Sequence, residues 1–316
     1  MEDEERELFD ECCDGNLEEA RILLTKGLDP VDWCTFSETP QTTCLVAAAM
    51  SGHADVLGLL LEQPGVDVNA TEEDGGTALQ AAVRGDHENI VKLLVDQPGI
   101  DLNTKSQDYE RMTALHYAAE KASKGVVDFL LSLPAVSVNE RDHKGKTPLH
   151  IAVTSSRQMD QEDVVRLLLD HPGIQVNLTD YEGHTALHDA TIRSAHPYIH
   201  PSTMYERSLV LLSMLLNYFK TDINAVDSKG QTVLHYAAGG NKNKPLSLLL
   251  QQPGLDLGAR DNRGRTALHL AAWGLGSGEN AFKLLLDQPG VDVQALDIDG
   301  CTALHNTCKN LGNLAA

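Results

Sequence analysis

Histidine is the residue type that most readily suggests chemistry here, because the chain contains 13 of them and imidazole can bind a metal or transfer a proton. His196 and His200 lie four residues apart, and each precedes a proline. A spacing of four would place both rings on one face of a helix. Residues before proline are pushed out of the helical region, however, and no cysteine lies nearby. The sequence therefore favours no metal site at this pair.

Six other histidines share one motif, T-x-L-H, in which a threonine precedes the histidine by three residues. They are His116, His150, His188, His235, His269 and His305. Each can hydrogen-bond its threonine hydroxyl, as Thr147 can with His150. If the motifs stack at helix spacing, the rings lie ~8–10 Å apart, whereas zinc ligands lie ~2 Å from the ion. We interpret these histidines as structural and expect neither a metal nor a cofactor.

Other catalytic signatures are weak or missing. The stretch "GLGSGEN" at 274–280 resembles a phosphate loop but has no G-K-[ST] ending, and the sequence contains neither a nucleophile elbow nor H-E-x-x-H. Carboxylates are numerous, but they occupy repeated positions that pair them into no acid–base site. We therefore expect the chain to catalyse nothing.

The motif marks a repeat of about 34 residues. Its leucines are Leu45, Leu79, Leu115, Leu149, Leu187, Leu234, Leu268 and Leu304, and Leu8 occupies the same place in an earlier, weaker copy. Each unit has two helical stretches, the first rich in small residues and the second aliphatic, as in "EDVVRLLLD" at 162–170. A segment such as "PGVDVN" at 64–69 then ends the pair, and a glycine-containing polar turn leads to the next unit.

This pattern resembles the ankyrin repeat family over about residues 5–312. The resemblance implies an all-α solenoid of about nine stacked helix pairs with projecting β-hairpins, in which hairpins and first helices form the concave side. We expect a single domain over residues 1–316, with a capping repeat and long first hairpin at 1–41. We also expect an insertion between two helices at 193–203 and an incomplete last repeat at 302–316, which favours a fragment of a longer chain. His53 and His87 begin second helices and resemble the family's capping residues.

Binding is the function that the resemblance implies. The positions after the motif histidine fall on the concave side, and the hairpin tips add a variable edge. The candidate partner-binding residues are Tyr117, Ile151, Tyr236, Leu270 and Trp273 on first helices, Tyr109 and Tyr181 at hairpin tips, and Tyr198 in the insertion. Tyr236, Leu270 and Trp273 either form an exposed apolar strip or are half-buried between repeats. The insertion is either a second contact site or tolerated padding.

The composition limits the class of partner that the chain can bind. The 46 acidic residues outnumber the 25 basic ones, giving a formal net charge of −21, which disfavours nucleic acid and favours a protein. The opening stretch "MEDEERELFDE" is acidic and has no apolar segment, so we expect no signal peptide. The sequence has no apolar run long enough to span a membrane, and the six cysteines show no pairing pattern. We expect a monomeric cytoplasmic or nuclear protein that acts as a scaffold, adaptor or inhibitor.

Two alternatives stay open. The chain is a recognition segment of a larger enzyme, since some kinases, ubiquitin ligases and poly-ADP-ribose polymerases carry such arrays. Alternatively, it inhibits a basic transcription factor, as the similar inhibitors of kappa-B do. The family is also a substrate of an asparaginyl hydroxylase at the position of Asn69, Asn103, Asn139, Asn177 and Asn224, although the one-residue-longer link separates this chain from the usual pattern.

Overall fold

A computed structural model describes residues 2–28, 43–72, 75–155, 160–195, 202–240, 243–272 and 281–307. The chain forms two compact units, Met1–His171 and Pro172–Ala316. Within the described ranges both units consist of paired helices, and strand pairing is limited to two isolated antiparallel bridges, Thr71 with Thr77 and Thr179 with Thr185. The expectation of an all-α array of paired helices is confirmed.

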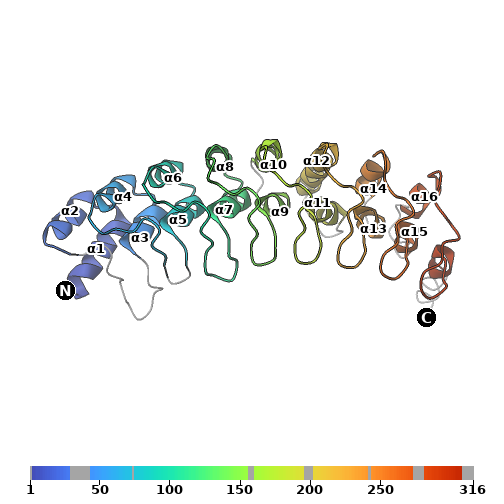
Figure 1. The fold of residues 1–316 in the computed structure, drawn as a ribbon, viewed down its shortest axis with the longest axis horizontal. Helices are drawn as coiled ribbons and strands as arrows, with labels where there is room; N and C mark the ends of the chain where they lie inside the picture. Colours follow the sequence, from blue (N-terminus) through green and yellow to red (C-terminus); the bar gives the residue numbers. More distant parts are fainter. Residues whose placement is uncertain are drawn as a thin grey trace. The chain divides into compact units, whose positions relative to one another are not determined.

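The described residues of the first unit form five helix pairs, which follow one another along the chain (Figure 1). They are α1 (Glu2–Asp14) with α2 (Leu17–Thr25), α3 (Cys44–Ser51) with α4 (Ala54–Leu61), α5 (Ala78–Arg84) with α6 (Glu88–Val95), α7 (Ala114–Lys121) with α8 (Lys124–Leu131), and α9 (Pro148–Thr154) with α10 (Gln161–Asp170). First helices pack against first helices, as α5 does on α3 and α7, and second helices pack against second helices. The projecting loops lie beside the first helices (Figure 1).

The second unit repeats this layering. Its helices are α11 (Ala186–Ala195), α12 (Ser202–Asn217), α13 (Val233–Gly239), α14 (Asn243–Leu250), α15 (Ala267–Ala271) and α16 (Ala281–Leu286), and residues 303–307 are also helical. Helix α12 has 16 residues and begins at Ser202. His196, Tyr198 and His200 lie outside the described residues, and so do residues 308–316 of the last repeat.

Small and branched side chains produce this packing. The motif leucines Leu79, Leu115 and Leu234 are at most 2% exposed, and Ala118 and Ala119 are fully buried. Alanine lets neighbouring first helices approach closely, and each helix pair packs against the next pair as well as within itself. Leu304 is the exception, with 58% of its side chain exposed.

His53 and His87 occupy the N-cap positions of α4 and α6, but neither side chain caps its own helix. Each ring instead contacts the preceding repeat. Nε2 of His53 lies 2.9 Å from the carbonyl oxygen of Cys13, and Nε2 of His87 lies 3.1 Å from that of Met50. The expectation that they act as caps is wrong in this respect. Gly52 is required beside His87, because its φ is 92° and a Cβ there would lie 2.7 Å from the ring.

The asparagines that close the links form a second set of contacts between repeats. Nδ2 of Asn69 donates to the carbonyl of Gly99 over 2.8 Å, and its Oδ1 accepts from the N–H of Asp101 over 2.8 Å. Asn103, Asn177 and Asn224 make the same pair of bonds to the link that follows them. These side chains therefore hold one link to the next, a role beyond the local turn that the sequence indicates.

None of the described helices is both long enough and apolar enough to cross a membrane.

Candidate functional site: the hairpin and first-helix face

The motif threonines and histidines form the base of each hairpin. In α7, Nδ1 of His116 accepts from the hydroxyl of Thr113 over 2.8 Å and from its N–H over 3.2 Å. Nε2 of His116 then donates to the carbonyl of Lys146 in the next hairpin over 3.0 Å. The motif histidines His188, His235 and His269 make the same three contacts. Each ring therefore joins its own turn to the next one, as the structural interpretation requires.

Burial favours the neutral form of three of these rings. Burial lowers the pKa of His116 from 6.5 to about 4, although its backbone contact with Lys146 acts in the opposite direction. Burial likewise lowers the pKa of His188 and His235. A neutral ring is needed for this geometry, because Nδ1 must accept while Nε2 donates.

An aspartate organises the tips of most of the described hairpins. Oδ1 of Asp227 accepts from the backbone N–H groups of Lys229 and Gln231 over 2.8 and 2.7 Å. The same pattern recurs at Asp142, Asp180, Asp261 and Asp297. Neighbouring tips are also joined, since the N–H of Ser228 donates to the carbonyl of Glu182 over 2.9 Å. The tips are therefore fixed in conformation, which suits a surface that must present side chains to a partner.

Two tyrosines hold their hairpins to the first helices. The hydroxyl of Tyr236 donates to Oδ2 of Asp227 over 2.6 Å, and that of Tyr117 donates to Oδ2 of Asp108 over 3.0 Å. Burial raises the pKa of both phenols, that of Tyr117 to about 12. Burial alone would raise the pKa of Asp227, but hydrogen bonds from Tyr236 and from the tip N–H groups lower it. The pairs are thus a neutral phenol and an ionised carboxylate.

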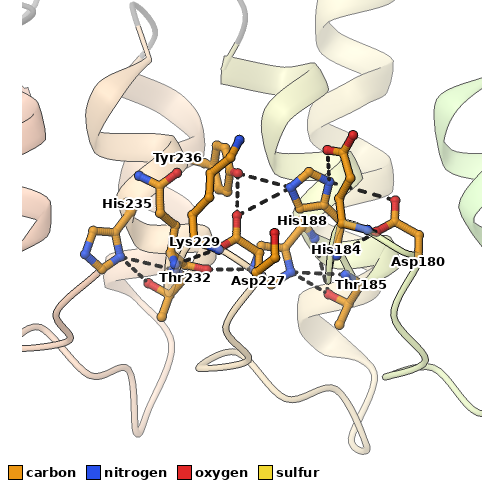
Figure 2. Close-up of polar contacts among 12 residues, drawn as sticks. Asp180, His184, Thr185, His188, Asp227, Lys229, Thr232, His235 and Tyr236 are labelled. Carbon is orange, nitrogen blue, oxygen red and sulfur yellow. Dashed lines mark hydrogen bonds and ion pairs between the residues drawn. The ribbon is translucent and has the colours of Figure 1, made fainter. Parts of the chain in front are cut away.

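His184 completes this network in the second unit (Figure 2). Nε2 of His184 lies 3.0 Å from the hydroxyl of Tyr236 and 3.5 Å from Oδ2 of Asp227. Its ring stacks on that of His188 at a centroid distance of 5.8 Å. Asp189 follows His188 in α11 and is 8% exposed. One nitrogen or oxygen from each of Asp180, His184 and Asp189 lies within 4.8 Å of the other two, so this set could hold a metal ion.

Grooves open on the first-helix side of each unit. In the first unit a groove of about 580 Å³ is lined by Arg84, Asp108, Glu110, Tyr117, Glu120, Lys121, Ile151, Thr154 and Ser155. In the second unit a groove of about 290 Å³ is lined by Ile192, Ala195, Gln231, His235, Tyr236, Gly239, Gly240 and Leu270. The first groove has charged walls, whereas most of the second groove is apolar.

The predicted binding residues divide by exposure. At the tips, Tyr109 and Tyr181 are 81% and 69% exposed, and the ring of Tyr109 lies 4.4 Å from that of His143 between centroids. Ile151, Tyr236 and Leu270 are half-buried in the walls of the grooves.

Tyr117 departs from the expected exposure, because it is only 4% exposed. Its hydroxyl is turned to Asp108, and the guanidinium of Arg84 covers its ring at 4.7 Å. Trp273 and Tyr198 lie outside the described residues, so the predicted strip of Tyr236, Leu270 and Trp273 is described only for its first two members, both half-buried.

The sequence gives no local motif for His184 and its carboxylate neighbours, unlike the motif histidines and the His-Pro pairs, and the cluster was therefore not predicted. One signal was present. The residue after the motif histidine is tyrosine at Tyr117 and Tyr236, but it is aspartate at Asp189. Since that tyrosine contacts the hairpin aspartate nine residues earlier, a carboxylate in its place must meet Asp180.

Comparison with known proteins agrees with this architecture. A search of curated proteins gave no match. A family model described as "Ankyrin repeats (3 copies)" matches residues 45–142, 98–180, 134–199 and 203–297, well over half of the sequence. The matched ranges contain the Thr–His pairs and the hairpin aspartates described above, and the chain therefore belongs to the ankyrin repeat family.

Proposed function

We propose that the chain is a protein-recognition module that binds a partner protein on the face formed by its hairpins and first helices. Ankyrin repeats are in general protein-binding modules. One observation carries the choice of face: the groove of about 580 Å³ on the first helices of the first unit. Half-buried Ile151 supplies an apolar surface there, and the exposed carboxylates Glu110 and Glu120 form a polar rim. Protein interfaces are on the whole about as polar as the rest of a protein surface, so the charged walls of this groove are compatible with one.

The hairpin tips also favour this face as the binding surface. Tyr109 projects beside this groove, next to the lining residue Glu110, with 81% of its side chain exposed. Tyrosine buries a large area on binding at a small cost in side-chain entropy. The tip carrying it is also rigid, since Oδ1 of Asp108 accepts from the N–H groups of Glu110 and Arg111.

Site-specific photo-crosslinking tests the proposal. Benzoylphenylalanine replaces Tyr109 or Glu120 on the proposed face, and replaces Leu93, which is 39% exposed on the second helix α6, as the control. We expect positions 109 and 120 to crosslink to the same partner protein in cells and position 93 to give none of that product. Crosslinking of that partner from position 93 alone would place the interface on the second helices and contradict the proposal.

A further inference from the structure

Three side chains of different origin meet beneath one hairpin of the second unit. Asp180 comes from the tip, His184 from the segment that returns to the helix, and Asp189 from α11. They are 7%, 8% and 8% exposed, and their ligand atoms lie within 4.8 Å of one another. Imidazole nitrogen and carboxylate oxygen are both zinc ligands, and three protein ligands with an open fourth position is a common zinc arrangement.

The orientation of His184 is the observation that points to an ion. The hydroxyl of Tyr236 gives its one proton to Asp227 at 2.6 Å, so it can only accept from Nε2 of His184 at 3.0 Å (Figure 2). Nδ1, the other ring nitrogen, faces the carboxylates of Asp180 and Glu182, with Oδ2 and Oε2 at 3.9 and 3.8 Å, and it is the nitrogen through which the neutral ring can bind a cation. Metal-bound histidines are commonly oriented in this way, with the second ring nitrogen donating to a neighbouring polar group.

The distances between the ligand atoms suit coordination of one shared ion better than a direct hydrogen bond between the side chains. Nδ1 of His184 lies 3.9 Å from Oδ2 of Asp180, beyond hydrogen-bond range. Two ligands of one tetrahedral zinc ion lie about 3.4 Å apart, given metal–ligand distances of about 2.1 Å. Small side-chain rotations would therefore bring these ligands to bonding distance. Oδ1 of Asp180 accepts from the N–H groups of Glu182 and His184, which leaves Oδ2 facing the imidazole.

Comparison among the repeats shows what is unusual here. In two other repeats the position of Asp189 holds a tyrosine that donates to the hairpin aspartate, as Tyr117 and Tyr236 do. In a third repeat, Arg265 binds the aspartate of its tip, with Nη2 lying 2.6 Å from Oδ2 of Asp261. Among the repeats that carry the T-x-L-H motif, only that of Asp180 has a carboxylate at this position. The two negative charges match the charge of one divalent cation, which makes its burial less costly.

We propose that Asp180, His184 and Asp189 bind a zinc ion, with water in the fourth position and Tyr236 as the residue that orients the imidazole. The bound ion would fix this hairpin to α11. The inference does not depend on the proposed partner-binding function, and no partner enters its test.

Zinc titration of the full chain, stripped with a chelator, tests the site by calorimetry. Two variants remove a ligand and copy a residue that neighbouring repeats already accommodate at the same position: His184→Gln copies Gln231, and Asp189→Tyr copies Tyr236. The matched control is His143→Ser at another hairpin tip, which copies Ser228. We expect the wild type and the control to bind one zinc ion equally, and each ligand variant to bind at least tenfold more weakly.

A second readout separates binding from folding. Zinc should raise the melting temperature of the wild type and of the control by mass action, and should leave both ligand variants unchanged. Tyr236→Phe keeps all three ligands, so we expect weaker but measurable binding. If Asp189→Tyr fails to fold, Asp189→Asn replaces it. Equal zinc binding by all variants, or no binding by the wild type, would overturn the assignment.

Discussion

The hydroxyl of Tyr236 donates to Oδ2 of Asp227 over 2.6 Å and thereby joins a first helix to the tip of its own hairpin. Tyr117 and Asp108 make the same contact in the first unit at 3.0 Å. The ring of Tyr236 remains half-buried in its groove, whereas that of Tyr117 is nearly enclosed. These tyrosines thus fix the hairpins to the first helices, and their hydroxyls are committed to intramolecular bonds.

Replacing Tyr236 by phenylalanine should destabilise the second unit. The change leaves the ring in place but removes a donor from Asp227, whose carboxylate is buried and ionised. Loss of one hydrogen bond to a buried charged group costs about 1–3 kcal/mol. Urea unfolding should show this loss for Tyr236→Phe, while Tyr181→Phe at a 69% exposed tip should change stability by less than about 0.5 kcal/mol. Equal effects of the two substitutions would refute the role assigned to the hydroxyl.

Replacing His116 by glutamine should reduce the loss of stability in acid. Burial holds the pKa of His116 at about 4, whereas the unfolded chain binds this proton near pH 6.5. The unfolded state therefore binds more protons than the folded state between these two pH values. The contribution of His116 to the free energy of unfolding is thus fully present above pH 6.5 and is lost as the pH falls toward 4. The shift corresponds to about 3 kcal/mol.

Glutamine suits this position, because Gln80 occupies it in another repeat and donates to the carbonyl of Met112 over 3.0 Å. Urea unfolding at pH 7 and pH 4.5 should show a smaller decrease for His116→Gln than for the wild type. Identical decreases in the two proteins would mean that His116 contributes nothing to the acid sensitivity.

Replacing Gly258 by asparagine should stabilise the chain. Gly258 stands where Asn224 closes the preceding link, and its N–H makes the corresponding bond to Asp256. Asparagine there could bond the carbonyl of Gly290 and the N–H of Asp292, as Asn224 bonds Gly254 and Asp256. A Cβ at this position meets nothing closer than 3.5 Å.

Gly258→Ala is the control, since it measures the gain from reduced backbone freedom alone, about 0.4–1 kcal/mol. Thermal or urea unfolding should give Gly258→Asn a free energy of unfolding about 1 kcal/mol higher than that of Gly258→Ala, because of the added hydrogen bonds. If the two variants are equally stable, the asparagine contacts do not hold successive links together.

Whether a contact can be predicted from the sequence depends on how far apart its two residues lie along the chain. The Thr113–His116 bond and the helix pairs follow from a local motif, and the sequence predicts both. The burial of Tyr117 does not follow, because it depends on a hairpin aspartate nine residues away whose direction the pattern leaves open. The bridge from Asn177 to Lys220 spans 43 residues, so it appears only once the repeats are stacked.

The convergence of Asp180, His184 and Asp189 was hidden for a related reason. The repeat motif draws attention to the residues that recur, whereas Asp189 and His184 occupy variable positions. Aligning the repeats on the residue after the motif histidine reveals that aspartate replaces tyrosine at Asp189. That this aspartate lies near Asp180 can be inferred only once the Tyr236–Asp227 contact is known.

Hydrogen exchange of the chain with its crosslinked partner tests the central claim, recognition by the hairpin and first-helix face, most directly. We predict that the partner slows exchange in the 106–112 hairpin and at the C-terminal ends of α7 and α9, which line the groove of the first unit. Exchange in the second helices α6 and α8 should be unchanged. Protection confined to α6 and α8, with the hairpin unaffected, would contradict the account.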